Sequence, residues 1–317
     1  MSDNGFATAF APASIGNVGV GFDMLGLALQ GVGDRVSARR TDGGGVSLSE
    51  VRGLDDEIHP FLSTDPESNT ASIAARALWE AHGDGGGIEL IVRKGVPLQS
   101  GMGSSAASAV AAVVAVNALL QRPLQRHELL EFAVEGEMFA SGDRHTDNIA
   151  PSLLGGLVLC PLVLLPNVIP LTVPDGVSSV LLHPEMQIST SQSRGKLARG
   201  YSMEQWLAQQ GYLAGFVAAC LLRDHDLLRD CLRDVVIEPQ RKDSISCFDD
   251  VKEAAMRANA YGCSISGSGP SIFALCADAD AANIAVRMEQ ACRGAGIECQ
   301  TWISPLTAPG AHLERSA

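Results

Sequence analysis

The segment that most constrains the fold is a glycine-rich stretch at residues 96–107, VPLQSGMGSSAA, between a predicted strand and a predicted helix. Residues 88–93 (IELIVR) have the pattern of a strand, and the Ala- and Val-rich residues 104–120 that of a helix. Gly101 and Gly103 lack side chains where the backbone must approach a ligand, while Ser104 and Ser105 place hydroxyl and free N–H groups at the helix start. Because these amides and the positive end of the helix dipole face the loop, the stretch predicts an anion site.

One alternative remains for this stretch when it is considered by itself. An ordinary helix start, with serine as the capping residue and glycine in the turn, has the same local pattern. The stretch is not a Walker A loop, because no lysine follows its last glycine, and it lacks the third glycine of the dinucleotide-binding fingerprint.

Composition narrows the function classes. The chain has 317 residues, 46% of them hydrophobic, which favours a globular protein with two domains or one large domain. A net charge of −13 with scattered Lys and Arg disfavours nucleic acid as a partner.

The cellular compartment of the protein is predicted from its cysteines and from its apolar segments. Eight widely spaced cysteines without a C-x-x-C pair predict free, buried thiols in a reducing compartment. The first ten residues lack the basic and apolar segments of a signal peptide, and the most apolar stretch, 157–171, is interrupted by prolines. We therefore expect a cytoplasmic protein without a membrane partner.

Strand-like and helix-like segments alternate along the chain. Further helices are predicted over residues 127–141, 202–223, 226–236 and 248–259, and a strand over 271–276. Short strands and turns are expected over 157–171. This order predicts an α+β fold in two layers, with one domain over residues 1–165 and a second over 166–317.

Two further glycine-rich segments lie near the two ends of the chain. Residues 11–29, APASIGNVGVGFDMLGLAL, embed Asn17 and Asp23 among apolar residues, where each either caps a turn or faces a ligand. Residues 262–275, GCSISGSGPSIFAL, have the pattern of a tight turn before a buried strand.

Together the three segments resemble the motifs of the GHMP kinases, in the same order. Residues 97–107 match P-x-x-x-G-[LM]-G-S-S-A-[AS], and residues 262–271 match the C-terminal motif, whose loop folds over the phosphate site. The resemblance implies a two-domain GHMP kinase fold, with an N-terminal domain like domain 2 of ribosomal protein S5, carrying a left-handed βαβ crossover, and a ferredoxin-like C-terminal domain. It also implies ATP on the glycine-rich loop.

Within this family the sequence is most similar to the homoserine kinases. The first motif and the run His145-Thr-Asp147-Asn148 followed by Ile-Ala-Pro match theirs, although Val20 stands where many members have proline. The resemblance implies that Glu137 and Ser105 hold Mg²⁺ and that Asp147 is the base or an orienting group. A glutamate on an amphipathic helix is more often simply solvated, so the role of Glu137 depends on the resemblance.

Two arginines favour an amino-acid substrate. Arg194 in ISTSQSR and Arg241 in VIEPQR occur in contexts similar to those that hold the substrate carboxylate in homoserine kinases, and a guanidinium suits a carboxylate. Asp23 would take the ammonium group. The alternatives are a GHMP kinase acting on an isoprenoid alcohol or a sugar, which should lack these arginines, and a silent nucleotide-binding regulator, which should have lost Glu137 or the serines.

The resemblance thus implies phosphorylation of L-homoserine by ATP, in the pathway to threonine, with ATP and Mg²⁺ required and a homodimer possible. The implied catalytic residues are Asn17, Asp147 and Asn148, and the substrate-binding residues are Asp23, His145, Arg194 and Arg241. The implied ATP-binding residues are Asn69, Pro97, Ser100, Gly101, Met102, Gly103, Ser104, Ser105 and Ser268.

Overall fold

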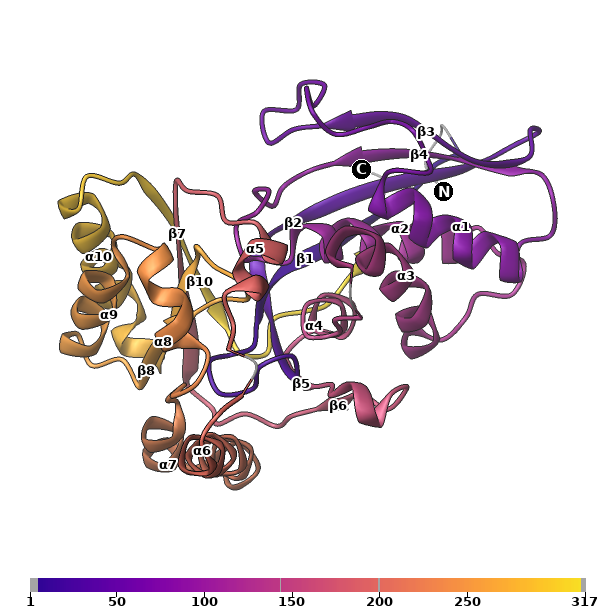
Figure 1. Ribbon diagram of the computed structural model, residues 1–317. Coiled ribbons are helices and arrows are strands. Elements are labelled where there is room, and N and C mark those ends of the chain that lie inside the picture. Colours follow the sequence, from indigo (N-terminus) through magenta and orange to yellow (C-terminus); the bar gives the residue numbers. More distant parts are fainter. Residues whose placement is uncertain (1–4, 143, 199, 315–317) are drawn as a thin grey trace.

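A computed structural model describes residues 5–142, 144–198 and 200–314, arranged around two β-sheets (Figure 1). The expectation for the first ten residues therefore concerns in part residues 1–4, which lie outside the described residues. The N-terminal half forms the first sheet and the helices beside it, and most of the C-terminal half forms the second.

The first sheet has the order β11-β1-β2-β4-β3, with β5 paired to β2 and β6 paired to β5. Its strands are β1 (Ala7–Gly16), β2 (Leu25–Thr41), β3 (Gly45–Arg52), β4 (Gly87–Arg93), β5 (Leu157–Leu159), β6 (Ile169–Pro170) and β11 (His312–Leu313). Strands β3 and β4 are parallel neighbours, joined through α1 (Thr70–His82). This is a βαβ crossover in the N-terminal half, where the resemblance implies one, and its handedness stays a prediction.

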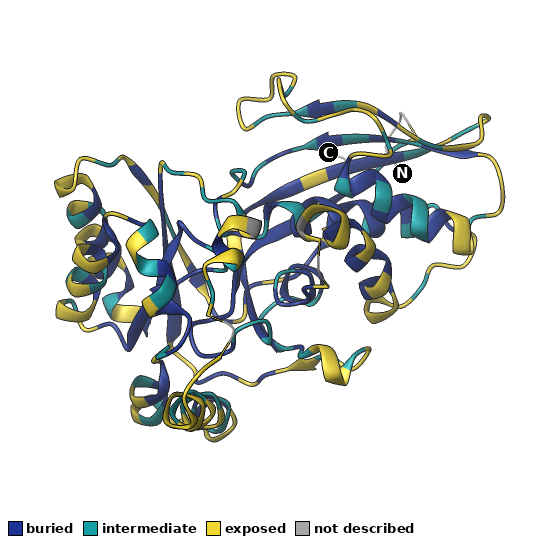
Figure 2. Ribbon diagram, viewed as in Figure 1, coloured by how far each residue is buried: buried dark blue, intermediate teal, exposed yellow. Residues whose placement is uncertain are grey.

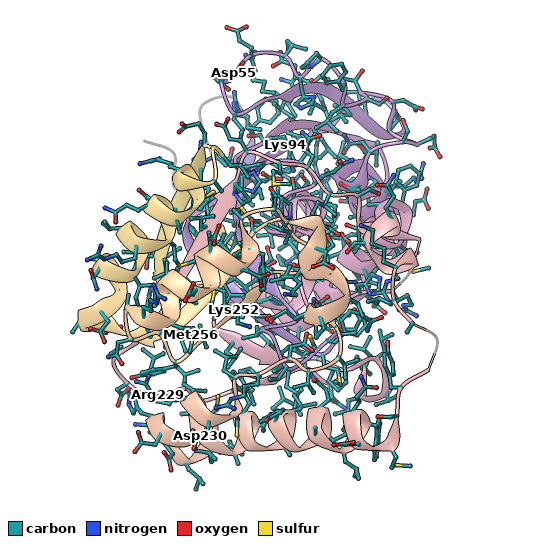
Figure 3. All side chains as sticks on the ribbon, turned by 60° about the vertical axis from the view of Figure 1, so that its left-hand side comes forward. Asp55, Lys94, Arg229, Asp230, Lys252 and Met256 are labelled. Carbon is teal, nitrogen blue, oxygen red and sulfur yellow. The ribbon has the colours of Figure 1, made fainter. Side chains whose placement is uncertain are left out.

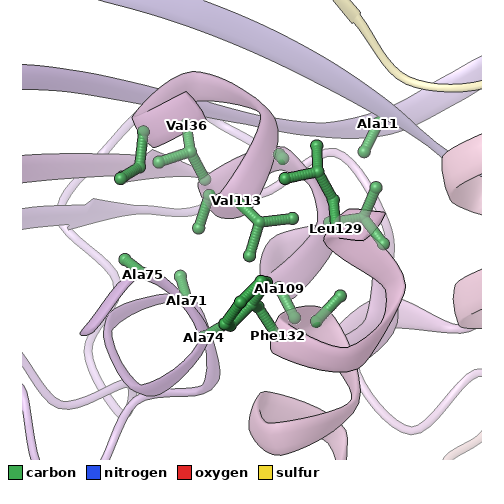
Figure 4. Packing of buried hydrophobic residues seen from close by; sticks show 14 of the residues in the cluster. Ala11, Val36, Ala71, Ala74, Ala75, Ala109, Val113, Leu129 and Phe132 are labelled. Carbon is green, nitrogen blue, oxygen red and sulfur yellow. The ribbon is translucent and has the colours of Figure 1, made fainter. Parts of the chain in front are cut away.

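Four helices lie beside the first sheet: α1, α2 (Ser104–Asn117), α3 (Leu130–Ser141), which follows a short 3₁₀ turn at Arg126–Leu129, and α4 (Ile149–Leu154). Eleven of the 14 residues of α2 are buried, as expected for a helix that is apolar on all sides. Alanines at the contacts between α1 and α2 let these helices pack closely, as the cluster around Ala74, Ala109 and Val113 shows (Figure 4). The helix that carries the glycine-rich loop is therefore held rigidly from several sides.

The second sheet has the order β10-β7-β9-β8, all antiparallel. Its strands are β7 (Val177–Pro184), β8 (Gly262–Ile265), β9 (Ile272–Ala277) and β10 (Cys299–Pro305). Helices α9 (Phe248–Arg257) and α10 (Asp278–Gly294) pack on it around a separate apolar cluster. Strand, helices, two strands, helix and strand in chain order form the βαββαβ arrangement, so the ferredoxin-like prediction is confirmed.

A third apolar cluster joins the two halves, with Ile15 and Leu27 from the first sheet, Leu181 and Phe273 from the second, and Phe216. Phe216 belongs to the long helix α6 (Met203–Leu222), which runs along one edge of the molecule beside α7 (His225–Cys231). None of the described helices is long and apolar enough to cross a membrane. All eight cysteines, which lie in the described part of the chain, are free and buried, as predicted.

The remaining elements are short, and one prediction among them is wrong. Helix α5 (Thr190–Gly195) and helix α8 (Glu238–Arg241) each span one or two turns. The helix predicted over 226–236 ends at Cys231, because the Asp234 carboxylate accepts the N–H groups of Val236, Ile237 and Glu238 and so starts α8. Apart from β11, the strands of the first sheet end at Pro170 and those of the second begin at Val177, while the boundary at 165/166 stays a prediction.

Candidate active site

A cavity of about 390 Å³ lies where the three glycine-rich segments meet. Fifteen of the seventeen residues singled out from the sequence line it: Asn17, Asp23, Asn69, Ser100, Gly101, Gly103, Ser104, Ser105, Glu137, His145, Asp147, Asn148, Arg194, Arg241 and Ser268. Pro97 and Met102 do not line it. The Met102 side chain is fully buried in the cluster that joins the two sheets, so it packs beneath the loop, although its carbonyl accepts the Ser14 N–H.

The glycine-rich loop leads from β4 into the first turn of α2. Gly103 is the capping residue, with φ of 68° and no side-chain cap, and the first helical hydrogen bond runs from Ala107 to the Gly103 carbonyl. The amides of Ser104, Ser105 and Ala106 therefore precede that bond and have no acceptor within the helix. A helix N-terminus with free amides thus lies beside the cavity, and its binding of an anion stays a prediction.

The two loop glycines are required by neighbouring protein segments. A Cβ on Gly101 would lie 2.5 Å from the Ser266 carbonyl oxygen, and one on Gly103 would lie 2.4 Å from Ser14 Oγ. Ser266 belongs to the third glycine-rich segment and Ser14 to the first. The glycines thus let the three segments pack together, which is a different reason from the ligand approach expected from the sequence.

The two serines of the loop have different partners. Ser104 Oγ donates to the Val96 carbonyl at 3.0 Å, so its hydroxyl fixes the loop. Ser105 Oγ donates to Glu137 Oε2 at 2.7 Å. Burial raises the pKa of the Glu137 carboxyl to about 7, against the opposing effect of the hydrogen bond from Ser105. Two oxygen ligands suited to a hard cation therefore lie together beside the helix N-terminus.

Asp147 occupies the part of the cavity nearest the first segment. Its Oδ2 accepts the Asn17 N–H at 3.1 Å, and Asn148 Nδ2 lies 3.4 Å from its other oxygen. Burial, with the negative charge of Asp23 as the second cause, raises the pKa of Asp147 to about 7. A carboxyl with such a pKa can take up a proton near neutral pH.

A cluster of charged groups forms another part of the cavity wall. Arg194 donates through one nitrogen to both carboxylate oxygens of Asp23, at 2.8 and 3.0 Å, and lies 3.2 Å from His145 Nδ1. Arg241 is 4% exposed and donates to the Gly267 carbonyl at 2.9 Å. The Nε atoms of both arginines are buried, and neither has an acceptor among the residues that the structure describes, so each arginine has donor capacity left for a ligand.

Two predicted residues have structural hydrogen bonds at the edge of the cavity. Asn69 caps α1, accepting the Ala71 N–H and donating to the Ser63 carbonyl. Asn17 similarly closes its own loop, because its Oδ1 accepts the Asp23 N–H and its Nδ2 donates to the Gly267 carbonyl.

Sequence reasoning missed a buried ion pair beneath the loop. Lys94, labelled in Figure 3, is buried; it pairs with Asp34 and also donates to the Ser104 carbonyl and to Ser108 Oγ, both at 2.8 Å. Asp34 is fully buried and accepts the amides of Gly95 and Val96. This network connects the end of β4 to the first turn of α2. Asp34 lies in β2 beside Arg35 and near Arg39 and Arg40, so no signal in the sequence indicated that this one charged residue is buried.

Sequence reasoning also missed Phe22, which lines the cavity next to Asp23. The guanidinium carbons of Arg194 and Arg241 each lie 5.3 Å from the centre of its ring.

Comparison with known proteins agrees with this geometry. Residues 69–156 match the family model of the GHMP kinase N-terminal domain, and residues 216–294 match that of the GHMP kinase C-terminal domain. A homoserine kinase of Xanthomonas campestris pv. campestris is 45% identical over 97% of this chain and 94% of its own length. One of Chlorobaculum tepidum is 38% identical over 96% and 97%.

Solved structures include one of high similarity. The crystal structure of homoserine kinase from Cytophaga hutchinsonii superposes with a TM-score of 0.93 at 39% identity, covering 99% of both chains. Sequence motifs, two-sheet fold, cavity and relatives lead to one assignment: this chain belongs to the homoserine kinases of the GHMP kinase family.

Proposed function

We propose that this chain transfers the γ-phosphoryl group of ATP to the side-chain hydroxyl of L-homoserine, giving O-phospho-L-homoserine and ADP. The observation that carries the proposal is the cluster of Asp23, Arg194 and Arg241 in the same cavity as the glycine-rich loop. An amino acid carries an ammonium and a carboxylate group, which a carboxylate and two guanidinium groups complement. Mevalonate has no ammonium group and a neutral sugar has neither charge.

On substrate binding, Asp23 and Arg194 would exchange their contact with each other for contacts with the charged groups of homoserine. Arg194 is paired with Asp23 in the structure, and its Nε is unused. Homoserine would insert its ammonium group at Asp23 and its carboxylate at Arg194 and Arg241, so the pocket charges remain neutralised throughout. The cost of desolvating a zwitterion is then offset by charge-assisted hydrogen bonds.

Mg²⁺ fits the pair formed by Ser105 and Glu137. Mg²⁺ prefers oxygen ligands and is commonly held by one or two protein groups together with substrate phosphates. Among the residues that the structure describes, no group of three or more His, Cys, Asp or Glu could hold a metal, so these two residues would act with the phosphates. When bound, the cation would neutralise charge developing on the β- and γ-phosphates.

The residues of the chain chiefly position the two reactants. The first-turn amides of α2 would bind phosphate oxygens, and Asp23 and the arginines would orient homoserine for in-line attack. Asp147 would accept the hydroxyl proton as the oxygen–phosphorus bond forms. Because phosphoryl transfer has a loose transition state, positioning supplies more of the rate than base strength.

The test compares two substrates that differ by one charge. Arg194→Ala and Arg241→Ala should each raise KM for homoserine by about ten- to a hundredfold, as expected for one charge-assisted hydrogen bond, and leave KM for ATP unchanged. Against homoserine amide, which lacks the carboxylate charge, both variants should lose far less. Arg39→Ala is the matched control, since Arg39 also pairs with a carboxylate and an aromatic ring but outside the cavity.

Two outcomes would contradict the proposal. Equal losses for acid and amide would remove the arginines from the carboxylate site. A wild-type enzyme that phosphorylates mevalonate or galactose faster than homoserine in a coupled ATPase assay would reassign the substrate.

We also propose a homodimer that forms through α6. Half of the residues of this helix are exposed (Figure 2), including large apolar side chains, and Glu204 is its one charged residue in a protein of net charge −13. A second copy of an acidic chain meets least repulsion at such an uncharged surface. The exposed apolar residues, with their exposed fractions, are Met203 70%, Trp206 52%, Leu207 58%, Leu221 64% and Leu222 71%.

Helix α6 is self-complementary when it pairs antiparallel with its own copy. The large side chains lie at its two ends and the small residues Gly211 and Ala214 near its centre, so a two-fold axis would place large against large and small against small. Leu207→Glu should give a monomer in sedimentation equilibrium, while Val286→Glu, on the exposed side of α10, should not. A wild-type chain that is monomeric at tens of micromolar would refute the dimer.

We expect the enzyme to act in the cytoplasm, because eight free, buried thiols are typical of a reducing compartment.

A further inference from the structure

The loop between β1 and β2 presents an aromatic ring to the charged part of the cavity. Residues 17–25 are held in a tight turn, with the Gly21 N–H bonded to the Asn17 carbonyl and the Leu25 N–H bonded to the Gly21 carbonyl. Asn17 and Asp23 both have positive φ, 66° and 56°, which fixes the path of the loop on either side of Phe22. Phe22 is thus carried at a fixed place on the cavity wall.

Both guanidinium groups proposed to bind the substrate carboxylate lie over this ring. Their central carbons are each 5.3 Å from its centre, within the range of a cation–π interaction. Arg194 comes from α5 and Arg241 from α8, and the two arginines are 47 residues apart in the chain. Both guanidinium groups are hydrogen-bond donors, so they cannot hold each other in place. Phe22 is the group that both contact.

Holding two arginines together carries an electrostatic cost. Burial lowers the pKa of Arg241, and the positive charge of Arg194 is the second cause. Asp23 offsets part of this repulsion by pairing with Arg194, while Arg241 donates to the uncharged Gly267 carbonyl. The negative face of an aromatic ring attracts both cations without accepting a hydrogen bond, so their N–H groups stay available to a ligand.

We infer that Phe22 is a positioning residue that holds Arg194 and Arg241 in place for the substrate carboxylate, so that it sets selectivity for an amino acid over an uncharged alcohol. The inference rests on the proposed carboxylate site. Phe22 acts through the arginines and not on the reacting atoms.

The expected signature is a change in KM that depends on substrate charge. Phe22→Leu keeps an apolar side chain of similar size but removes the ring, and should raise KM for homoserine by about five- to thirtyfold, as expected from two cation–π contacts. It should change kcat and KM for ATP little, and should affect homoserine amide far less than homoserine. Phe22→Tyr and Phe22→Trp keep a π-face and should restore most of the affinity.

A matched control separates this effect from loss of an aromatic ring in general. Phe10 lies 5.0 Å from the guanidinium of Arg35 on the first sheet, outside the cavity. Phe10→Leu therefore removes the same kind of contact and should leave both KM values unchanged.

A double-mutant cycle tests whether Phe22 acts through the arginines. In the background of Arg194→Ala combined with Arg241→Ala, Phe22→Leu should cause little further loss. An equal loss in that background, or equal losses for acid and amide, would show that Phe22 contacts the substrate carbons directly and would overturn the inference. The proposed function would still stand in that case, because it is tested separately, by the response of the arginine variants to acid and amide and by the choice of substrate of the wild-type enzyme.

Discussion

Glu137→Gln should make the ligand-free protein more stable at alkaline pH while reducing its activity. Glu137 is 8% exposed, and burial raises the pKa of its carboxyl from 4.5 to about 7. Between these two pH values the folded chain binds a proton that the unfolded chain does not, so the free energy of unfolding falls as pH rises through this window. Glutamine resembles the protonated carboxyl and can still accept the Ser105 hydroxyl.

A rise of the Glu137 pKa from 4.5 to about 7, at about 1.4 kcal/mol for each pH unit, corresponds to about 3 kcal/mol. Most of this difference appears between pH 5 and pH 8. Relative to the wild type, the variant should therefore gain about 2–3 kcal/mol over that interval, or about 5 °C in Tm at pH 8.

The assay is thermal unfolding without nucleotide or Mg²⁺ at pH 5, 6.5 and 8. Glu135→Gln is the matched control, because Glu135 lies on the same helix and is exposed. It should show no comparable gain. A Glu137→Gln variant whose Tm difference from wild type is the same at pH 5 and pH 8, or that is less stable at pH 8, would refute the reasoning.

Asp147→Asn should lower kcat by about 10²-fold or more if Asp147 accepts the hydroxyl proton, and a rate near that of the wild type would exclude obligatory base catalysis. Ser105→Ala should lower turnover sharply across a Mg²⁺ titration with an unchanged circular dichroism spectrum, whereas a wild-type kcat at ordinary Mg²⁺ would remove Ser105 from the cation site. Asp34→Asn should lower the free energy of unfolding by about 3–5 kcal/mol, because it leaves the buried Lys94 charge without its partner. In urea unfolding, the double variant Asp34→Asn with Lys94→Met should recover part of the stability lost in Asp34→Asn. A loss below about 1 kcal/mol for Asp34→Asn alone would contradict the role of the pair.

Elements set by local sequence were predictable. The strand at 88–93 and the helix beginning at Ser104 depend on apolar patterning and on a capping glycine within one continuous stretch, and both are confirmed. The helix predicted over 226–236 failed because its end depends on a side chain, Asp234, that bonds to amides outside the apolar pattern. Apolar spacing alone gives no account of such competition between side chain and backbone.

The parts of the site that join distant segments were not predictable from local patterns. Asp34 and Lys94 are 60 residues apart, and Phe22 meets its arginines across more than 170 residues. The Gly101 and Gly103 positions were identified, but their reason was not, since the Ser266 and Ser14 groups that exclude a Cβ belong to other segments. Such contacts depend on tertiary folding, and only the family resemblance brought the residues of the cavity together in advance.

The interlocked glycine segments also determine when the site can form during protein synthesis. The Ser271 N–H bonds to the Ser100 carbonyl, Ser266 Oγ to the Gly101 carbonyl, and the Gly267 N–H to the Gly16 carbonyl. Strand β11 pairs with β1 at the far edge of the first sheet. A nascent chain must therefore expose the first two segments on the ribosome until residues near 271 have left the exit tunnel. The enzyme acquires its phosphate loop in final form only when nearly the whole chain has been made.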